Sequence, residues 1–181
     1  SRGWITAEYS LLPTSTSTRC QRERSKVSGR TQEIQRLIGR ALRSCVDLTK
    51  LGERTIIIDA DVIQADGGTR CASICGGYVA LSLAISRMIK DGKLEQSPIL
   101  EPIAAVSAGI HNGEVILDLN YEEDSSAQVD SNAVMTKSGK VIEFQTTAEG
   151  EPYDIEKMNQ IVELSKNAIQ KIIDIYPNTE A

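Results

Sequence analysis

The spacing of apolar residues predicts three long helices. Apolar positions recur every three or four residues over 31–47 and over 154–176, which is typical of helices with one buried face. Residues 69–90 are rich in Ala, Leu and Ile around most of a helical circumference, which predicts a buried helix. The pair Gly76-Gly77 inside this segment weakens a helix, so we expect close packing or a slight bend there.

Alternating apolar and polar positions predict the strands. Residues 4–12 form one predicted strand, and residues 55–64, dense in Ile and Val, form a second that we expect to be central in its sheet. Two hairpins follow, over 103–120 around an Asn-Gly turn and over 129–147 around a Ser-Gly turn. Residues 13–28, rich in Ser and Thr, predict a long loop. The mixture predicts one α+β domain over residues 1–181, a mixed sheet packed against helices.

Composition narrows the class of protein. With 181 residues the chain is long enough for one domain and short for two. No apolar run approaches the ~18 residues of a membrane span, and no signal peptide is apparent, so we expect a cytoplasmic protein with no membrane contact. The four cysteines are then reduced thiols. Cys71 and Cys75, four positions apart on a predicted helix, are expected to be small core residues, although they could share a metal.

The charge is unevenly distributed. The net charge of −5 argues weakly against a nucleic-acid partner. The stretch from Arg19 to Arg43, however, holds eight basic and two acidic residues, so the rest of the chain carries a net charge of −11. Such asymmetry favours one surface for an anionic partner, the alternative being a solvated helix face beside a flexible basic loop.

The run Asp66-Gly67-Gly68-Thr69-Arg70 is a candidate anion site between a predicted strand and a predicted helix. Glycines let backbone N–H groups approach an anion, and a helix N-terminus adds unpaired donors and a positive dipole. Thr69 adds a hydroxyl, and Arg70 adds a guanidinium suited to phosphate. The run matches neither the P-loop nor the dinucleotide-binding pattern. The alternative is a plain strand-to-helix turn with a surface arginine.

An acidic run is the second candidate site. Residues 118–130 contain five carboxylates, which repel one another unless a cation or a proton offsets their charge. Mg²⁺ held by one or two carboxylates beside a phosphate is the usual arrangement for phosphoryl chemistry. The alternative is a solvated acidic loop. A mechanism that needs histidine would rest on His111 alone, which lies in a predicted turn.

Several stretches, taken in order, resemble the ribonuclease PH family, whose bacterial members trim transfer-RNA 3′ ends by phosphorolysis. The matching stretches are GWITAEYS at 3–10, SGRT at 28–31, EIQRLIGRALR at 33–43, DADVIQADGGTR at 59–70 and LDLNYEEDSSAQVD at 117–130. The resemblance implies an α+β fold of the ribosomal-S5-domain-2-like superfamily. It also implies a homo-oligomeric, hexameric ring built as a trimer of dimers.

The resemblance also implies an activity and roles for particular residues. Inorganic phosphate, the co-substrate, attacks the terminal 3′ phosphodiester of a tRNA, with roles in rRNA processing as well. A nucleoside diphosphate is released, and the reverse reaction adds nucleotides. The implied phosphate-binding residues are Arg30, Gly68, Thr69 and Arg70; the catalytic acidic pair, which also holds Mg²⁺, is Asp124 and Asp130; the RNA-binding residues of the basic loop are Arg19 and Arg22.

The chain departs from the family pattern in two places. The family has about 55 more N-terminal residues, with a basic Asp-Gly-Arg motif and the first strands, so we expect an N-terminally incomplete domain with an open sheet edge. Thr14 stands where an arginine is usual, in a slightly shortened basic loop, which weakens the expected grip on RNA. Two alternatives remain: a catalytically inactive RNA-binding scaffold subunit of an exosome-like ring, or a catalytic exosome-type subunit.

Overall fold

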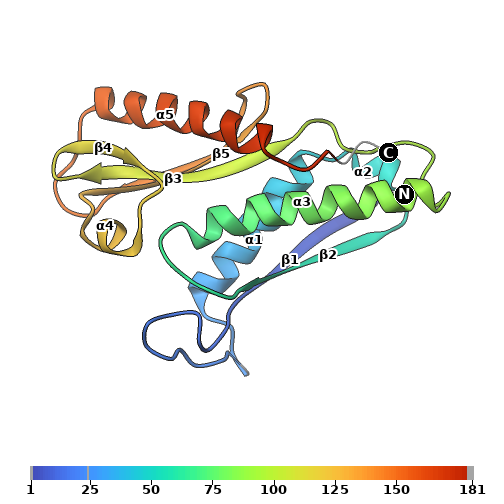
Figure 1. Cartoon of the computed structure of the whole chain (residues 1–181), viewed down its shortest axis with the longest axis horizontal. Coiled ribbons are helices and arrows are strands. Elements are labelled where there is room, and N and C mark those ends of the chain that lie inside the picture. The colour runs from blue at the N-terminus through green and yellow to red at the C-terminus, as the bar shows by residue number, and fades with distance from the viewer. Residues whose placement is uncertain (1, 24, 179–181) are drawn as a thin grey trace.

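Four layers of alternating sheet and helix make up the molecule in this computed structural model, which describes residues 2–23 and 25–178 (Figure 1). Arg24, part of the basic stretch, lies outside the described residues. The elements in chain order are β1 (Trp4–Leu11), α1 (Gly29–Ser44), α2 (Leu48–Leu51), β2 (Thr55–Val62), α3 (Thr69–Lys90), β3 (Ile103–His111), β4 (Glu114–Leu117), α4 (Tyr121–Ser126), β5 (Val129–Thr136), β6 (Val141–Ala148) and α5 (Ile155–Asp174).

The layers follow from which faces are apolar. The strands β1 and β2 form a parallel pair, and α1 and α3 cover its inner face. A four-stranded antiparallel sheet of order β4-β3-β5-β6 lies on the other side of these helices, and α5 covers its far face (Figure 1). The α+β class is therefore confirmed, with sheets packed against helices. Pairing is parallel in one sheet and antiparallel in the other.

Most predicted elements are present. The helix α3 has the predicted bounds, and α1 begins two residues earlier than predicted, where the Ser28 hydroxyl accepts a hydrogen bond from the Thr31 N–H. Both hairpins are confirmed. Asn112 and Gly113 adopt φ values of 51° and 80°, the left-handed backbone that an Asn-Gly turn supplies. Two short helices, α2 and α4, were not predicted, because four and six residues are too few to show a helical period.

The prediction that β2 is central in its sheet is wrong for the residues that the structure describes. Its ladder partner there is β1, and the outer face of the pair is open. Ile57 on that face is 59% exposed, whereas Ile58 on the inner face is buried. Density in Ile and Val reports a preference for extended backbone, and it does not distinguish a strand with two neighbours from a strand with one.

Helix α3 is the centre of the main core, although it is less buried than its composition suggests. An added Cβ at Gly77 would lie 3.4 Å from both the Ile58 Cγ2 and Leu42 Cδ1 atoms, so the predicted close packing is confirmed at that glycine. Nothing lies within 4 Å of such an atom at Gly76, and Leu83 is 50% exposed. By length and composition α3 could cross a membrane, a test that core helices of soluble proteins also pass. Here it packs against α1, β2 and β3.

Candidate active site

The turn from β2 into α3 forms the candidate phosphate loop, defined here as residues 63–68. It ends at Gly68, whose φ of +67° is a left-handed conformation that glycine adopts without strain. No side chain caps the helix, so the N–H groups of its first turn have no side-chain acceptor. The Thr69 hydroxyl is 2.8 Å from the Tyr9 hydroxyl, which fixes it against β1. The loop and the first two residues of α3 therefore present backbone donors, the Thr69 hydroxyl and the Arg70 guanidinium at one helix end.

The phosphate loop packs directly on the acidic segment. An added Cβ at Gly67 would lie 1.8 Å from the Leu119 carbonyl oxygen, so the two backbones touch at a point where only glycine fits. The Asp66 carboxylate accepts hydrogen bonds from the N–H of Gly67 at 2.9 Å and from the N–H of Tyr121 at 2.6 Å. The two halves of the site, predicted separately from the sequence, are thereby joined at the start of α4.

The acidic segment is a short helix followed by a strand. Asn120 and Glu123 form a capping box that starts α4, which carries Asp124. Asp130 lies on β5 opposite Gly109 of β3. Burial raises the pKa of Asp130, the negative charge of Asp124 raises it further, and Arg70 and Arg30 oppose the shift. The charges of all three candidate residues, Asp124, Arg70 and Arg30, therefore affect the pKa of Asp130.

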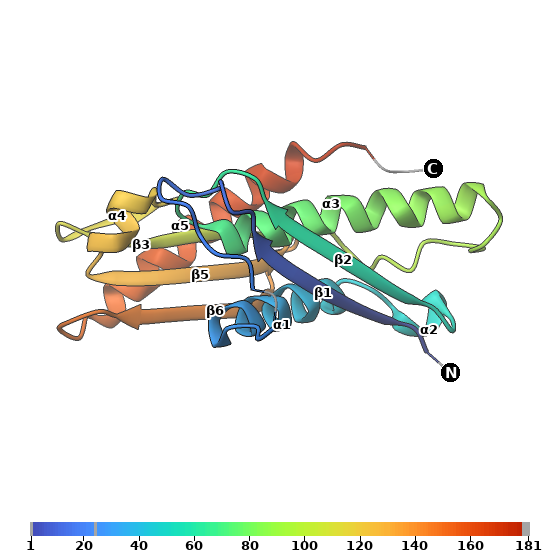
Figure 2. The same ribbon diagram turned by 90° about the horizontal axis from the view of Figure 1, so that it is seen from below.

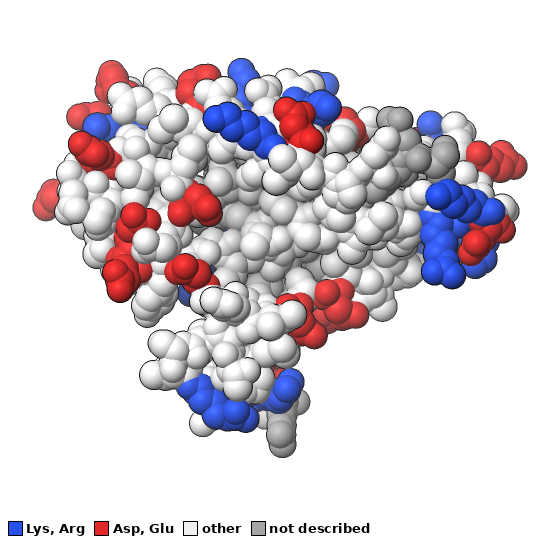
Figure 3. Space-filling model, viewed as in Figure 1, with Lys and Arg blue, Asp and Glu red and all other residues white. Residues whose placement is uncertain are grey.

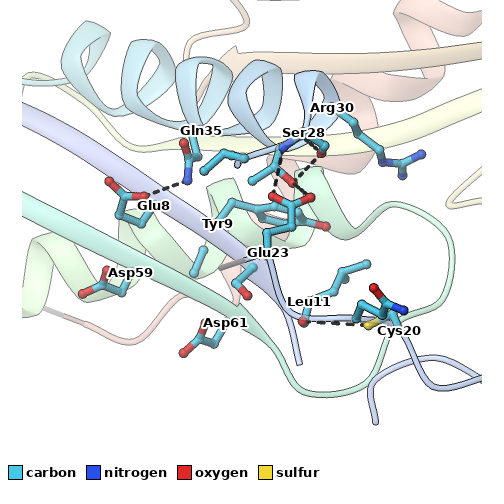
Figure 4. Close-up of a pocket in the computed structure, with 15 residues that line it drawn as sticks. Glu8, Tyr9, Leu11, Cys20, Glu23, Ser28, Arg30, Gln35, Asp59 and Asp61 are labelled. Carbon is cyan, nitrogen blue, oxygen red and sulfur yellow. Dashed lines mark hydrogen bonds between the residues drawn. The ribbon is translucent and has the colours of Figure 1, made fainter. Parts of the chain in front are cut away.

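Arg30 reaches the site from the first turn of α1. The Glu23 carboxylate accepts hydrogen bonds from the Ser28 N–H and the Thr31 hydroxyl, each at 3.1 Å, and so ties the basic loop to the start of this helix. These bonds, led by the bond with Ser28, lower the pKa of Glu23. Figure 4 shows Glu23 facing Ser28, with the Arg30 side chain extending away from Glu8 and Asp59.

The cavities divide around these residues. A pocket of about 500 Å³ beneath the basic loop includes Arg30 together with Glu8, Asp59 and Asp61 (Figure 4). Another, of about 430 Å³, lies behind the phosphate loop and is lined by Gly67, Gly68, Cys71, Cys75, Asp118 and Lys171, among others. Arg30 and the phosphate loop therefore line different cavities.

Arg19 and Arg22 lie apart from the phosphate residues. They line a hollow of about 550 Å³ with Pro13, Cys20 and Gln21. Figure 3 shows basic side chains at the tip of this loop and acidic side chains on the side of the molecule that carries α4. In Figure 2 the loop, α4 and the β2–α3 turn gather at the end of the molecule opposite α2. The structure therefore brings six of the eight predicted site residues together and places these two arginines on a neighbouring loop.

The residues present fit a magnesium ion held by few protein ligands. Asp124 and Asp130 are close enough for one charge to raise the pKa of the other, a repulsion that a cation relieves. No group of three or more His, Cys, Asp or Glu suited to a metal occurs within residues 2–23 and 25–178, so these two carboxylates are the candidate protein ligands.

The two helical cysteines and the single histidine contact residues outside the predicted site. The Cys71 thiol donates to the Asn132 side-chain oxygen at 3.2 Å, and the Cys75 thiol contacts the Ala105 backbone at 3.3 Å. Burial raises the pKa of both thiols. His111 lies at the β3–β4 turn, where its ring contacts the Asn112 side chain.

Sequence reasoning missed the roles of several supporting residues, including Asp66, which it named only as part of the anion run. Tyr9 orients Thr69, Asp66 joins the two halves, Glu23 anchors the loop, and Glu33 of α1 forms an ion pair with Arg70 at 3.6 Å. Only the position of Glu33 near Arg30 could be predicted, because it lies three residues after Arg30 and therefore on the same side of a helix; its partner Arg70 on another helix could not.

Known proteins match nearly the whole chain. Residues 1–86 match the 3′ exoribonuclease family, domain 1, and residues 101–168 match domain 2 of the same family. Ribonuclease PH of Neisseria gonorrhoeae is 56% identical over 179 residues, which cover 98% of this chain and 74% of that protein. Ribonuclease PH of Neisseria meningitidis is 54% identical over the same shares of the two chains.

The fold is also that of a solved structure of low identity. The exosome of Archaeoglobus fulgidus with RNA bound to its active site superposes with a TM-score of 0.77 at 21% sequence identity, over 97% of this chain and 72% of that one. At this identity the likeness supports the fold alone. The two matched family regions and the Neisseria relatives lead to one conclusion: this chain belongs to the 3′ exoribonuclease family of ribonuclease PH.

Proposed function

We propose that this chain is a phosphate-dependent 3′→5′ exoribonuclease, a tRNA nucleotidyltransferase that removes nucleotides from tRNA 3′ ends as nucleoside diphosphates. The observation that supports it best is the junction of the phosphate loop and the acidic segment through the Asp66 carboxylate. A helix end that binds anions and a pair of carboxylates, held together, are the two parts that phosphoryl transfer needs.

The roles of the residues follow from their charges. Arg30, the backbone of Gly68, the Thr69 hydroxyl and Arg70 bind the attacking phosphate and orient one oxygen toward the terminal phosphorus. A P–O bond forms to that oxygen, the bond from phosphorus to the 3′ oxygen of the shortened RNA breaks, and a nucleoside diphosphate leaves. The arginines offset negative charge on the reacting phosphorus. No nucleophilic side chain is required, because phosphate is the nucleophile.

Asp124 and Asp130 would hold the magnesium ion, which when bound supplies positive charge beside the reacting oxygens. The two carboxylates keep that position fixed, since one is carried by α4 and the other by the β5 ladder. Arg19 and Arg22 bind the RNA backbone upstream of its 3′ end. We further propose a single domain over residues 1–181, a cytoplasmic location and a homo-oligomeric ring of six subunits. The Neisseria relatives and the exosome likeness support assembly into a ring.

The test is the release of nucleotides from an RNA with an unstructured 3′ tail. We expect nucleoside diphosphates in the presence of inorganic phosphate and none in its absence. Release of monophosphates without phosphate would refute phosphorolysis. RNA binding with no release under either condition would favour the inactive scaffold subunit.

Two variants and a control assign the roles. Arg70→Ala should abolish the use of phosphate. Asp130→Asn should lower turnover while RNA affinity stays near that of the wild type. Arg87→Ala removes an exposed arginine near the other end of α3 and should leave both properties unchanged. Wild-type turnover in either site variant would contradict its assignment.

A further inference from the structure

Glu33 is the one acidic side chain paired with a candidate phosphate-binding arginine in the part of the chain that the structure describes. Its Oε2 atom lies 3.6 Å from the Nη2 atom of Arg70, and the pair joins α1 to α3. Glu33 follows Arg30 by three residues on α1, so both lie on one side of that helix. The carboxylate thus contacts one of the two arginines expected to hold phosphate and is carried about one helical turn from the other.

A negative charge at this place opposes the binding of an anion. The Glu33 carboxylate also costs folding free energy, because its second oxygen, Oε1, is buried without a hydrogen-bond partner. Buried polar atoms of this kind are few in native proteins and call for an explanation. Glu33 cannot be present to attract phosphate, because both are negatively charged. Its contact with Arg70 can instead fix the orientation of that guanidinium.

Arg70 has two carboxylates within its influence. Glu33 pairs with it directly, and the positive charge of Arg70 opposes the rise in the pKa of Asp130 that burial causes. The Arg70 side chain is only 19% exposed, so it has little freedom to turn toward solvent. Without Glu33 the Asp130 carboxylate would compete for this guanidinium, because arginine readily forms a two-pronged pair with a carboxylate. That pair would occupy donors needed by phosphate.

The other arginines near Glu33 either pair with another carboxylate or are exposed to solvent. Glu33 also lines a groove of about 350 Å³ that includes Arg36, Arg40 and Glu143. Arg40 donates to Glu143 at 2.7 Å, and Arg36 is exposed to solvent. Arg70 is therefore the arginine that the Glu33 carboxylate contacts most directly.

We propose that Glu33 is a positioning residue for phosphate, which holds the Arg70 guanidinium between α1 and α3 so that its free N–H groups face the attacking phosphate. This inference rests on the proposed function and adds a residue that determines phosphate affinity specifically. The removal of Glu33 should affect phosphate and leave RNA binding alone. A merely structural tie between two helices would instead change stability and leave both Michaelis constants unaltered.

The kinetic test compares Glu33→Gln and Glu33→Asp with the wild type. We expect the KM for phosphate to rise about tenfold in Glu33→Gln, with kcat and the KM for RNA within about twofold. Glu33→Asp keeps the charge and should recover part of the loss. Glu53→Gln changes an exposed glutamate beside α2, at the opposite end of the molecule, and is the matched control. In an Arg70→Lys background the effect of Glu33→Gln should shrink, because no guanidinium remains to be oriented.

A second measurement does not depend on turnover. Inorganic phosphate should raise the Tm of the wild-type protein, and Glu33→Gln should need about tenfold more phosphate for the same rise. An unchanged phosphate requirement in Glu33→Gln by this measure, or a KM for RNA that rises in step with the KM for phosphate, would overturn the inference. A wild type that binds phosphate yet releases no nucleoside diphosphate would refute the proposed function and leave the role of Glu33 to be decided by the binding data.

Discussion

Gly67 is the position at which the two halves of the site touch, and its substitution gives the sharpest test of that contact. A Cβ at Gly67 would lie 1.8 Å from the carbonyl oxygen of Leu119, 2.8 Å from its carbonyl carbon and 3.0 Å from the carbonyl carbon of Asn120. All three atoms are backbone, so no flexible side chain can move aside. Gly67→Ala must therefore separate the phosphate loop from the acidic segment.

The expected cost has two parts. Overpacking costs typically 1–3 kcal/mol, and we place this case at about 2–3 kcal/mol because backbone must shift. The shift also strains the bond from the Tyr121 N–H to Asp66, an exposed contact that contributes about 0.5–1 kcal/mol. The sum is about 3 kcal/mol, which lowers the Tm of a chain of this size by about 6–12 °C.

Gly76 supplies the matched control. It lies in the exposed part of α3, and an added Cβ there meets nothing within 4 Å. Gly76→Ala should stabilise the helix by about 0.5–1 kcal/mol and raise the Tm by about 1–4 °C. Thermal unfolding followed by circular dichroism measures both shifts, and the phosphate-dependent assay should show activity lost only in Gly67→Ala. A Gly67→Ala protein that melts within about 1 °C of the wild type and stays active would refute the contact.

Three further outcomes are expected. Asp66→Ala removes the hydrogen bond from the Tyr121 N–H, which joins the loop to α4, and the bond from the Gly67 N–H within the loop. The Tm should therefore fall by about 2–6 °C and turnover should drop, and an unchanged Tm would contradict the joining role. Because the folded pKa of Glu23 lies below its ordinary value of 4.5, its contribution is complete above about pH 4.5 and is lost as the pH falls through the folded pKa. The difference in Tm between the wild type and Glu23→Gln should therefore shrink below pH 4.5; an equal difference at neutral and acidic pH would count against this anchor. Burial raises the pKa of Cys45 to about 12, so alkylation of the native protein at pH 8 should modify the partly exposed Cys20 and spare Cys45, as peptide mass spectrometry can show; equal labelling would contradict the buried thiol.

Local signals allowed much of the fold to be predicted. The α3 bounds follow from a glycine pair before an apolar helix, and both hairpin turns follow from glycines with positive φ at Gly113 and Gly139. These features depend on the residues immediately beside them. The position of β2 in its sheet depends on which distant segment pairs with it, and no local pattern of Ile and Val contains that information.

The site likewise has parts that local sequence predicts and parts that depend on distant segments. Arg70 and Asp124 could be named from short runs of sequence, each with its own chemical argument. Their juxtaposition could not be derived, because it depends on a hydrogen bond from the Tyr121 N–H to the Asp66 carboxylate, across 55 positions of the chain. The pairing of Glu33 with Arg70 spans two helices and was equally out of reach. Family resemblance supplied the juxtaposition where residue chemistry alone left alternatives open.

The structure also changes the reason for the glycine pair in the phosphate loop. From the sequence, both glycines were expected to let backbone N–H groups approach an anion. Gly68 fits that expectation, since its left-handed backbone turns the chain into an uncapped helix end. Gly67 is needed for a different contact, because the carbonyl of Leu119 occupies the space that any side chain would fill. One glycine thus shapes the anion site, and the other fixes the distance between that site and the carboxylates. A substitution at Gly67 should therefore impair the chemistry even if the anion site itself remains intact.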